Sequence, residues 1–177
     1  MGATGLCDRS AIPWLERAAA LAPAWNAPRF EIGQCMRRLC RWPEAAAHLT
    51  HVLERGWPDK ALWYEVGIWQ RTAGNLREAL DAFEHARRSI PGWLAPHKEV
   101  GICLRMLNRL AEASTVLQHA VTIEPEWAGA HFELGVTHLA GKDEGRAAVH
   151  FQRAADLRPE WDAPRGALAA LTTTAVS

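Results

Sequence analysis

Glutamate recurs at one fixed interval along this chain of 177 residues. Glu31, Glu65, Glu99 and Glu133 stand 34 residues apart, and no basic residue follows any of them by three or four positions. An ion pair along one helix therefore does not explain the recurrence. Two interpretations stay open: the carboxylates are solvated or pair with a neighbouring repeat, or they accept hydrogen bonds from basic or backbone donors of a ligand.

Other residue types recur beside the glutamates. Arg37, Arg71 and Arg105 share one repeat position, with Arg38 next to Arg37. Their guanidinium groups can neutralise the glutamates or hold a carboxylate of a partner. Spacings of three and four residues place the recurrent residues on one stripe of a helix. The residues before the glutamates are Phe30, Tyr64, Lys98 and Phe132, and those three positions after them are Gln34, Ile68, Ile102 and Val136.

No arrangement in the sequence predicts catalysis. We find no serine–histidine–aspartate set, no metal-ligand cluster and no phosphate-cradling glycine loop. His51, His85 and His119 share one repeat position, but neighbouring helices lie about 10 Å apart, too far for three imidazoles to share a metal. We interpret them as solvated. Cys35 and Cys103 occupy equivalent helical positions, and the chain has no C-x2-C spacing. We expect no enzyme activity, no metal and no cofactor.

The elements that must position these residues are short helices within a 34-residue repeat. Each helix has about a dozen residues and is too short to persist alone in water, so the repeats are expected to stack. Glycine at the eighth position and alanine at the twentieth let two antiparallel helices approach closely. Apolar residues at the seventh, twenty-fourth and twenty-seventh positions fill the seam. The glycines are Gly33, Gly67, Gly101 and Gly135, and the alanines are Ala45, Ala79, Ala113 and Ala147.

This pattern resembles the tetratricopeptide repeat, which runs W-x2-L-G-x2-Y, then A-x3-F, then P. Four repeats in phase carry the resemblance. It implies an all-α fold, namely a right-handed superhelical α-solenoid of helix-turn-helix repeats. The last repeat matches through Leu134-Gly135, Ala147, Phe151, Ala154 and Pro159.

The chain departs from the family pattern at several positions. Arg29, His97 and His131 stand at the fourth position in place of tryptophan, and we expect the two histidines to take over its packing role. Family members that clamp the C-terminal carboxylate of chaperones use lysine at the fifth position and asparagine at the ninth, among other residues. Only Lys98 is a fifth-position lysine here. A chaperone-tail receptor is therefore not expected.

The phase of the repeat sets the expected boundaries. Residues 10–172 form a single solenoid, with tails at 1–9 and 173–177. Within it we expect a lone second helix at 10–25, four repeats at 26–59, 60–93, 94–127 and 128–161, and a capping helix at 162–172. The alternative that the chain is a piece of a longer array stays open.

In the tetratricopeptide family, the first helices of the repeats line a concave groove. The resemblance therefore implies that the recurrent stripe is a groove that binds a peptide or protein segment. The expected function is a non-catalytic interaction scaffold. The alternative is a structural adaptor or assembly factor that self-associates as a homo-oligomer. The expected groove residues are Phe30, Glu31, Gln34, Arg37, Arg38, Tyr64, Glu65, Ile68, Arg71, Lys98, Glu99, Ile102, Arg105, Phe132, Glu133 and Val136.

Tryptophan is abundant, with nine residues. Trp25, Trp93, Trp127 and Trp161 each precede a first helix by one position, where a large apolar group can staple the incoming chain onto the next helical turn. The alternative is a row of partly exposed indoles that grips an apolar or proline-rich ligand.

Composition excludes several classes of protein. Twenty basic and twenty acidic residues give no net charge, so a non-specific nucleic-acid binder is not expected. No apolar run approaches the roughly 20 residues that span a bilayer, and the first residues show no secretory signal. We therefore expect a cytoplasmic protein without membrane insertion. Arginine outnumbers lysine 17 to 3, which suits a bacterial genome rich in G and C.

Overall fold

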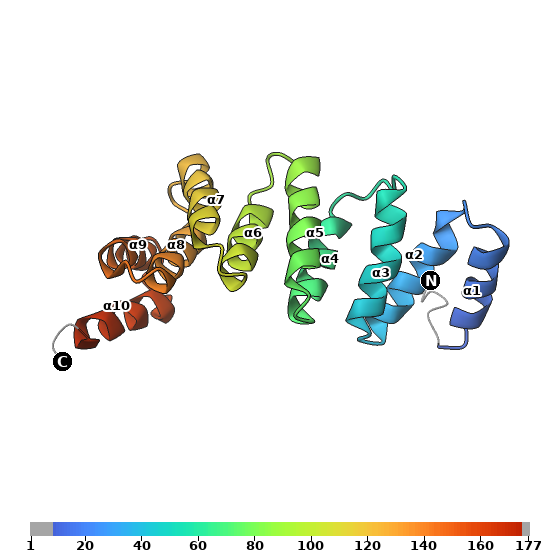
Figure 1. Ribbon diagram of the computed structural model, residues 1–177, viewed down its shortest axis with the longest axis horizontal. Coiled ribbons are helices and arrows are strands. Elements are labelled where there is room, and N and C mark those ends of the chain that lie inside the picture. The colour runs from blue at the N-terminus through green and yellow to red at the C-terminus, as the bar shows by residue number, and fades with distance from the viewer. Residues whose placement is uncertain (1–8, 175–177) are drawn as a thin grey trace. The chain divides into compact units, whose positions relative to one another are not determined.

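Residues 9–174 are described by a computed structural model of the chain (Figure 1). Within this range the chain forms ten α-helices and no β-strand, which confirms the predicted all-α fold class. The chain divides into two compact units between Ile90 and Pro91. We call the part before this boundary unit 1 and the part after it unit 2.

Neighbouring helices pack in sequence order within each unit. In unit 1, α1 packs on α2, α2 on α3, α3 on α4 and α4 on α5. In unit 2, α6 packs on α7 and α8, α7 on α8, α8 on α9 and α9 on α10. The even-numbered helices are the first helices of the repeats. Unit 1 contains α1 (Ile12–Leu21), α2 (Asn26–Arg38), α3 (Trp42–Glu54), α4 (Leu62–Thr72) and α5 (Leu76–Ser89); unit 2 contains α6 (Ala95–Met106), α7 (Leu110–Ile123), α8 (Ala128–Ala140), α9 (Glu144–Leu157) and α10 (Asp162–Thr174).

The helices have 10 to 14 residues each, so packing rather than intrinsic propensity must stabilise them. None of the described helices is long and apolar enough to cross a membrane.

The repeated glycines lie at the closest contact between the two helices of each repeat. A Cβ atom built on Gly67 would fall 2.6 Å from the ring of Phe83, and one on Gly135 would fall 2.5 Å from the ring of Phe151. Gly33 and Gly101 meet Leu49 and Leu117 in the same way, at 2.7 and 2.5 Å. Real Cβ atoms do not approach other atoms this closely. The side chain at the twenty-fourth position therefore occupies the space that the glycine leaves open.

The other recurrent apolar positions form the core around this contact, as the sequence predicts. The seventh-position residues, Ile32, Val66, Val100 and Leu134, are at most 1% exposed. The four alanines at the twentieth position are fully buried. Each helix pair thus closes over a seam of small residues flanked by branched ones, which is the dense packing expected of a protein interior.

The turn inside each repeat has one backbone geometry. Its fifteenth residue is left-handed, with φ of 57° at Cys40, 85° at Gly74, 60° at Asn108 and 61° at Lys142. The next backbone N–H donates to a carbonyl five residues earlier, as from Arg41 to Met36 at 2.9 Å. This is the Schellman arrangement that satisfies the last carbonyls of a helix. Only one of the four residues is glycine, although glycine adopts this conformation most readily.

We predict that Gly135→Ala destabilises the chain. The added methyl group would force Phe151 out of its seat, and overpacking of this kind costs about 1–3 kcal/mol. Urea unfolding measures the change in the free energy of unfolding. Gly166→Ala in α10 is the matched control, because a Cβ there meets nothing within 4 Å and a helical alanine is favoured over glycine by roughly 0.5–1 kcal/mol. Equal effects of both substitutions would contradict the packing role of Gly135.

Candidate functional site

The first helices of unit 1 carry nine of the expected groove residues. Phe30 on α2 stacks on Trp57, with ring centroids 4.5 Å apart, and Tyr64 on α4 meets the edge of the Phe83 ring at 5.5 Å. Both anchors are half-buried, while Glu31 is exposed. On α2 lie Phe30, Glu31, Gln34, Arg37 and Arg38, and on α4 lie Tyr64, Glu65, Ile68 and Arg71.

The charged residues of unit 1 differ in how far their positions are fixed. Glu31 and Glu65 are exposed. Arg37 donates from Nε to the side-chain oxygen of Gln34 at 2.9 Å, which holds its guanidinium group along α2. Arg38 is exposed at the end of the same helix. The carboxylates of Glu31 and Glu65 are thus exposed next to the aromatic side chains of Phe30 and Tyr64.

The first helices of unit 2 carry the other seven. The Arg105 guanidinium on α6 lies 3.2 Å from the Glu133 carboxylate on α8, with side-chain exposures of 24% and 16%. Glu99 is only 5% exposed at its side chain and lies 3.3 Å from the Lys98 ammonium. Phe132 packs against Trp161 at 4.8 Å. The seven residues are Lys98, Glu99, Ile102 and Arg105 on α6, and Phe132, Glu133 and Val136 on α8.

The four recurrent glutamates are therefore not equivalent. Glu133 follows the interpretation in which the acid pairs with a neighbouring repeat, because its partner Arg105 belongs to the preceding one. Glu31 and Glu65 remain open to a ligand. The sequence shows only that glutamate recurs every 34 residues. The neighbouring side chains determine which of the four carboxylates are buried or paired and which are exposed.

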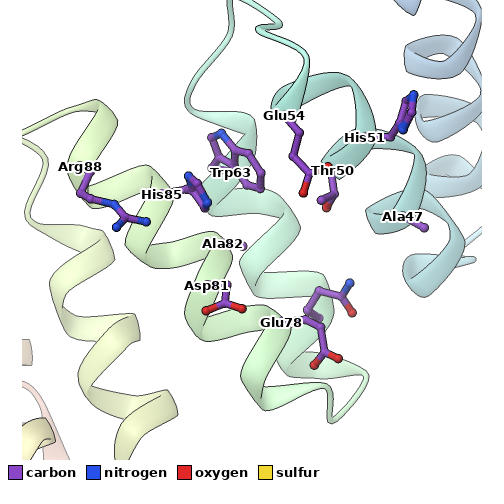
Figure 2. A pocket seen from close by; sticks show the side chains of 11 residues that line it. Ala47, Thr50, His51, Glu54, Trp63, Glu78, Asp81, Ala82, His85 and Arg88 are labelled. Atoms are coloured by element: carbon purple, nitrogen blue, oxygen red, sulfur yellow. The ribbon is translucent and has the colours of Figure 1, made fainter.

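A cavity of about 550 Å³ lies outside the expected groove, between α3, α4 and α5 (Figure 2). Three carboxylates line it, those of Glu54, Glu78 and Asp81, against the single guanidinium group of Arg88. We call it the acidic pocket. Its other lining residues are Ala47, Thr50, His51, Trp63, Gln70, Ala82 and His85.

A second cavity, of about 510 Å³, lies between α7, α8 and α9 of unit 2. It lies at the equivalent repeat positions, two repeats later, but its chemistry differs. His138 stands where the acidic pocket has Gln70, Arg146 where it has Glu78, and His150 where it has Ala82. We call it the histidine pocket. It is lined by Ser114, Thr115, Gln118, His119, Thr122, His138, Arg146 and His150.

In the second and third repeats, the fourth-position side chain packs against the twenty-sixth position of the same repeat. The ring centroids of Trp63 and His85 lie 4.4 Å apart in a stacked pair, and those of His97 and His119 lie 5.8 Å apart. Figure 2 shows the Trp63 and His85 rings next to each other. His97 is 4% exposed, which confirms its predicted packing role. Of the three histidines interpreted as solvated, His85 and His119 are exposed but have one ring face covered, and His51 is half-buried.

Three histidines meet at the histidine pocket: His138 and His150, which line it, and His131. Nδ1 of His131 lies 3.2 Å from Nδ1 of His150, and the His138 ring stacks on that of His150 at 5.5 Å. Burial lowers the pKa of His150, and the charges that His131 and His138 can carry lower it further. Burial also lowers the pKa of His131, against a raising effect of the Pro125 carbonyl. No group of three or more His, Cys, Asp or Glu within residues 9–174 is arranged to hold a metal.

The tryptophans that precede first helices are not one uniform row. Trp127 packs against the core cluster that includes Leu117 and Leu134, and Trp161 packs against Phe132. Trp25 is 59% exposed. In unit 2 the packing role therefore applies to Trp127 and Trp161, whereas the indole of Trp25 is open to solvent.

Comparison with known proteins identifies the fold. No protein-family model matches the sequence, and no curated protein matches it. Among solved structures, the chain is similar to YrrB, described as a TPR protein with an unusual peptide-binding site. The two share 20% identity and a TM-score of 0.76 over 89% of this chain and 81% of that one.

Two further structures support the same fold. A fragment of MamA from Desulfovibrio magneticus RS-1 is 21% identical, with a TM-score of 0.68 over 87% of each chain. The first TPR of Spaghetti (RPAP3), bound to the HSP90 peptide SRMEEVD, is 18% identical, with a TM-score of 0.62 over 67% of this chain and 94% of that one. These likenesses show the fold of tetratricopeptide-repeat proteins.

We predict that the free energy of unfolding decreases as the pH falls below about 6.5. Burial and, next, the Arg29 charge lower the pKa of His48, and the pKa values of His131 and His150 are lowered as described. The unfolded chain then binds more protons than the folded one, so this stability is present above the ordinary histidine pKa and is lost below it. Urea unfolding at about pH 7.5 and about pH 5.5 measures the change.

His150→Gln is the test variant for this pH dependence. It removes one titrating ring and should make the change between the two pH values smaller than in the wild type. An unchanged or larger pH dependence would contradict the contribution of His150.

Proposed function

We propose that this tetratricopeptide-repeat fold is a non-catalytic scaffold that binds a peptide or protein segment along the first-helix face of its repeats. The first-helix face is the set of sixteen residues expected from the sequence, nine in unit 1 and seven in unit 2. Two of the similar structures favour a peptide ligand, since YrrB is described as having a peptide-binding site and the Spaghetti repeat is bound to a peptide.

The observation that carries the proposal is the surface of unit 1. Glu31 and Glu65 are exposed and uncommitted to an intrahelical cation, and they lie next in sequence to the half-buried rings of Phe30 and Tyr64. Aromatic anchors beside charged groups are typical of binding hot spots. A segment with basic side chains or free backbone N–H groups matches this surface, because carboxylates accept strong hydrogen bonds from both.

Unit 2 would contribute apolar contacts and a fixed charge pair. Ile102, Phe132 and Val136 are half-buried on α6 and α8. The pair between Arg105 and Glu133 holds both side chains in place, so neither must be ordered when a partner binds. We therefore expect the face of unit 1 to select its ligand by charge and the face of unit 2 to offer mainly apolar contact area.

The chemistry of the face supports a binding role rather than catalysis. Its sixteen residues include no serine, threonine, cysteine or histidine. A nucleophile activated by a neighbouring base is the usual requirement for covalent catalysis. The face therefore lacks the serine, threonine and cysteine nucleophiles and the histidine base, and its charges and apolar side chains are suited to holding a ligand.

We predict that Glu31→Lys combined with Glu65→Lys abolishes partner binding while the fold persists. Both residues are exposed, so the reversal should leave the thermal unfolding midpoint nearly unchanged. Affinity should fall by at least about tenfold, because two attractive contacts become repulsive. Pull-down with quantitative mass spectrometry identifies the partner, and calorimetry with that partner measures the affinity.

The matched control is Glu54→Lys combined with Glu78→Lys. These residues are also exposed and lie in the same unit, but on the second helices α3 and α5. The control should retain the partner. Loss of the partner from both double variants, or from neither, would reject the first-helix face of unit 1 as the binding surface.

Self-association is a second candidate function, and the surface of α1 favours it. Trp14 and Leu21 stand seven residues apart and so share one face of the helix, where they are 73% and 79% exposed. Ala11, Trp14 and Leu15 also line a cavity of about 420 Å³ with Ser10 and Glu31. Large exposed apolar side chains on one face are typical of protein contacts.

We predict that, if α1 joins two copies, Trp14→Ser combined with Leu21→Ser converts an oligomer to a monomer. Removing both apolar contacts leaves little surface to exclude water from the interface. Light scattering over a wide range of concentrations measures the molar mass. A wild-type monomer at the highest concentration would remove this candidate.

A further inference from the structure

The histidine pocket has a chemistry that the first-helix face does not use. Its lining comes from three helices: Thr115, Gln118 and His119 on α7, His138 on α8, and His150 on α9, among others. Every lining residue is polar, and none of those within residues 9–174 carries a carboxylate. The acidic pocket two repeats earlier carries three carboxylates, and two of them, Glu54 and Glu78, stand at positions equivalent to Thr122 and Arg146. The two cavities therefore favour ligands of opposite charge.

Hydrogen bonds fix where the protons lie on two of the histidines. Nε2 of His131 lies 3.1 Å from the Pro125 carbonyl oxygen, which can only accept, so this nitrogen donates. In neutral His131, Nδ1 is then the acceptor. His150 must donate its Nδ1 proton to it across 3.2 Å. Neutral His150 is left with an unprotonated Nε2, which is the basic atom of the pair.

Protonation of Nε2 would place a cation on the His150 ring, which lines the pocket. The titratable groups around His150 are His131 and His138 from α8, whose rings contact it, and His119 of α7 and Arg146 of α9, which line the same pocket. None of them is acidic. Asp143 lies 3.1 Å from the Arg146 guanidinium and offsets that charge only. α10 also packs against α9 but contributes no lining residue.

We propose that the histidine pocket binds a phosphate group together with one proton, which is taken up at Nε2 of His150. Protonated His150 and Arg146 would donate charge-assisted hydrogen bonds to the phosphate oxygens. The phosphate would supply the negative charge that the pocket lacks. This inference concerns the second-helix side of unit 2 and does not rest on the proposed peptide-binding function.

The threonines of the pocket favour phosphate over other anions. Thr115 and Thr122 donate their hydroxyl protons to the carbonyls of Ala111 and Gln118, both at 2.9 Å. Their oxygens can therefore only accept a hydrogen bond from a ligand. A phosphate near neutral pH still carries a P–OH donor part of the time, because its second pKa is about 6 in a monoester. Sulfate has the same shape but no such donor.

The state of the histidines agrees with a proton-linked site. Burial lowers the pKa of both His131 and His150, so without an anion the pair is neutral near pH 7. An anion beside the ring raises the pKa of a histidine, and by linkage proton uptake must accompany binding.

The test is calorimetric titration of inorganic phosphate into the full chain at about pH 6 and about pH 7.5, where affinity should be higher at the lower pH by up to about tenfold per pH unit. Repeating the titration in two buffers of different ionisation enthalpy measures the protons taken up, expected to be close to one per phosphate. NMR of the histidine ring protons should show the largest shift at His150. Sulfate should bind at least about tenfold more weakly, since it leaves the threonine oxygens without a donor.

The decisive variant is His150→Gln, with His85→Gln in the acidic pocket as the matched control. The first should lose at least about tenfold in phosphate affinity, along with the proton uptake, while the control keeps both. Circular dichroism confirms that each variant is folded. Absence of phosphate binding at either pH would overturn the proposal. So would equal binding of sulfate, or unchanged binding and proton uptake in His150→Gln.

A second pair of titrations identifies the source of the phosphate group. A short phosphoserine peptide that binds more tightly than inorganic phosphate, with its unphosphorylated form inactive, assigns the site to phosphorylated protein segments. Phosphate that binds while the peptide does not assigns it to small phosphorylated molecules.

Discussion

In each of the four repeats, a glycine in the first helix lets the helix backbone lie directly against one large apolar residue of the second helix. The ring of Phe151 seated on Gly135 is the clearest example. Glycine in the middle of a helix costs roughly 0.5–1 kcal/mol relative to alanine, so its use there requires a compensating contact. Close approach allows the neighbouring alanines and branched residues to be buried completely. The positions of all surface side chains on both helices depend on this separation.

The fold could be predicted from the sequence because the contact between the two helices of a repeat requires the same residue types every 34 residues. Glycine, alanine and branched residues recur at 34-residue spacing, and each type has a packing reason that the structure bears out. The turn geometry could not be predicted in the same way. Cys40 and Lys142 adopt the left-handed conformation at positions where residue type gives no warning. At these two residues the hydrogen bonds of the turn, from Arg41 to Met36 and from Asp143 to His138, accompany the conformation, and the residue types alone do not reveal them.

The candidate sites were less predictable, since a stripe along one helix does not reveal what lies opposite. Glu65 and Glu99 are one residue type at one repeat position, yet the first is exposed and the second is buried. The histidine pocket was not foreseen, because three separate helices contribute His119, His138 and His150. A signal did exist at equivalent positions of different repeats, where Arg146 replaces Glu78 and His138 and His150 replace Gln70 and Ala82. Reading it required knowing which positions share a cavity.

The uniform turn has a consequence for how this chain can vary. The left-handed residue and the hydrogen bond donated by the next backbone N–H recur in the turn of all four repeats. These turns are therefore too short to contain a loop that recognises a ligand. Insertion of even one amino acid at the turn would rotate the second helix by about 100° about its axis and turn its apolar face away from the first helix. Changes in ligand specificity are therefore expected from substitutions of exposed residues on the helices, which leave the packing between the helices unchanged.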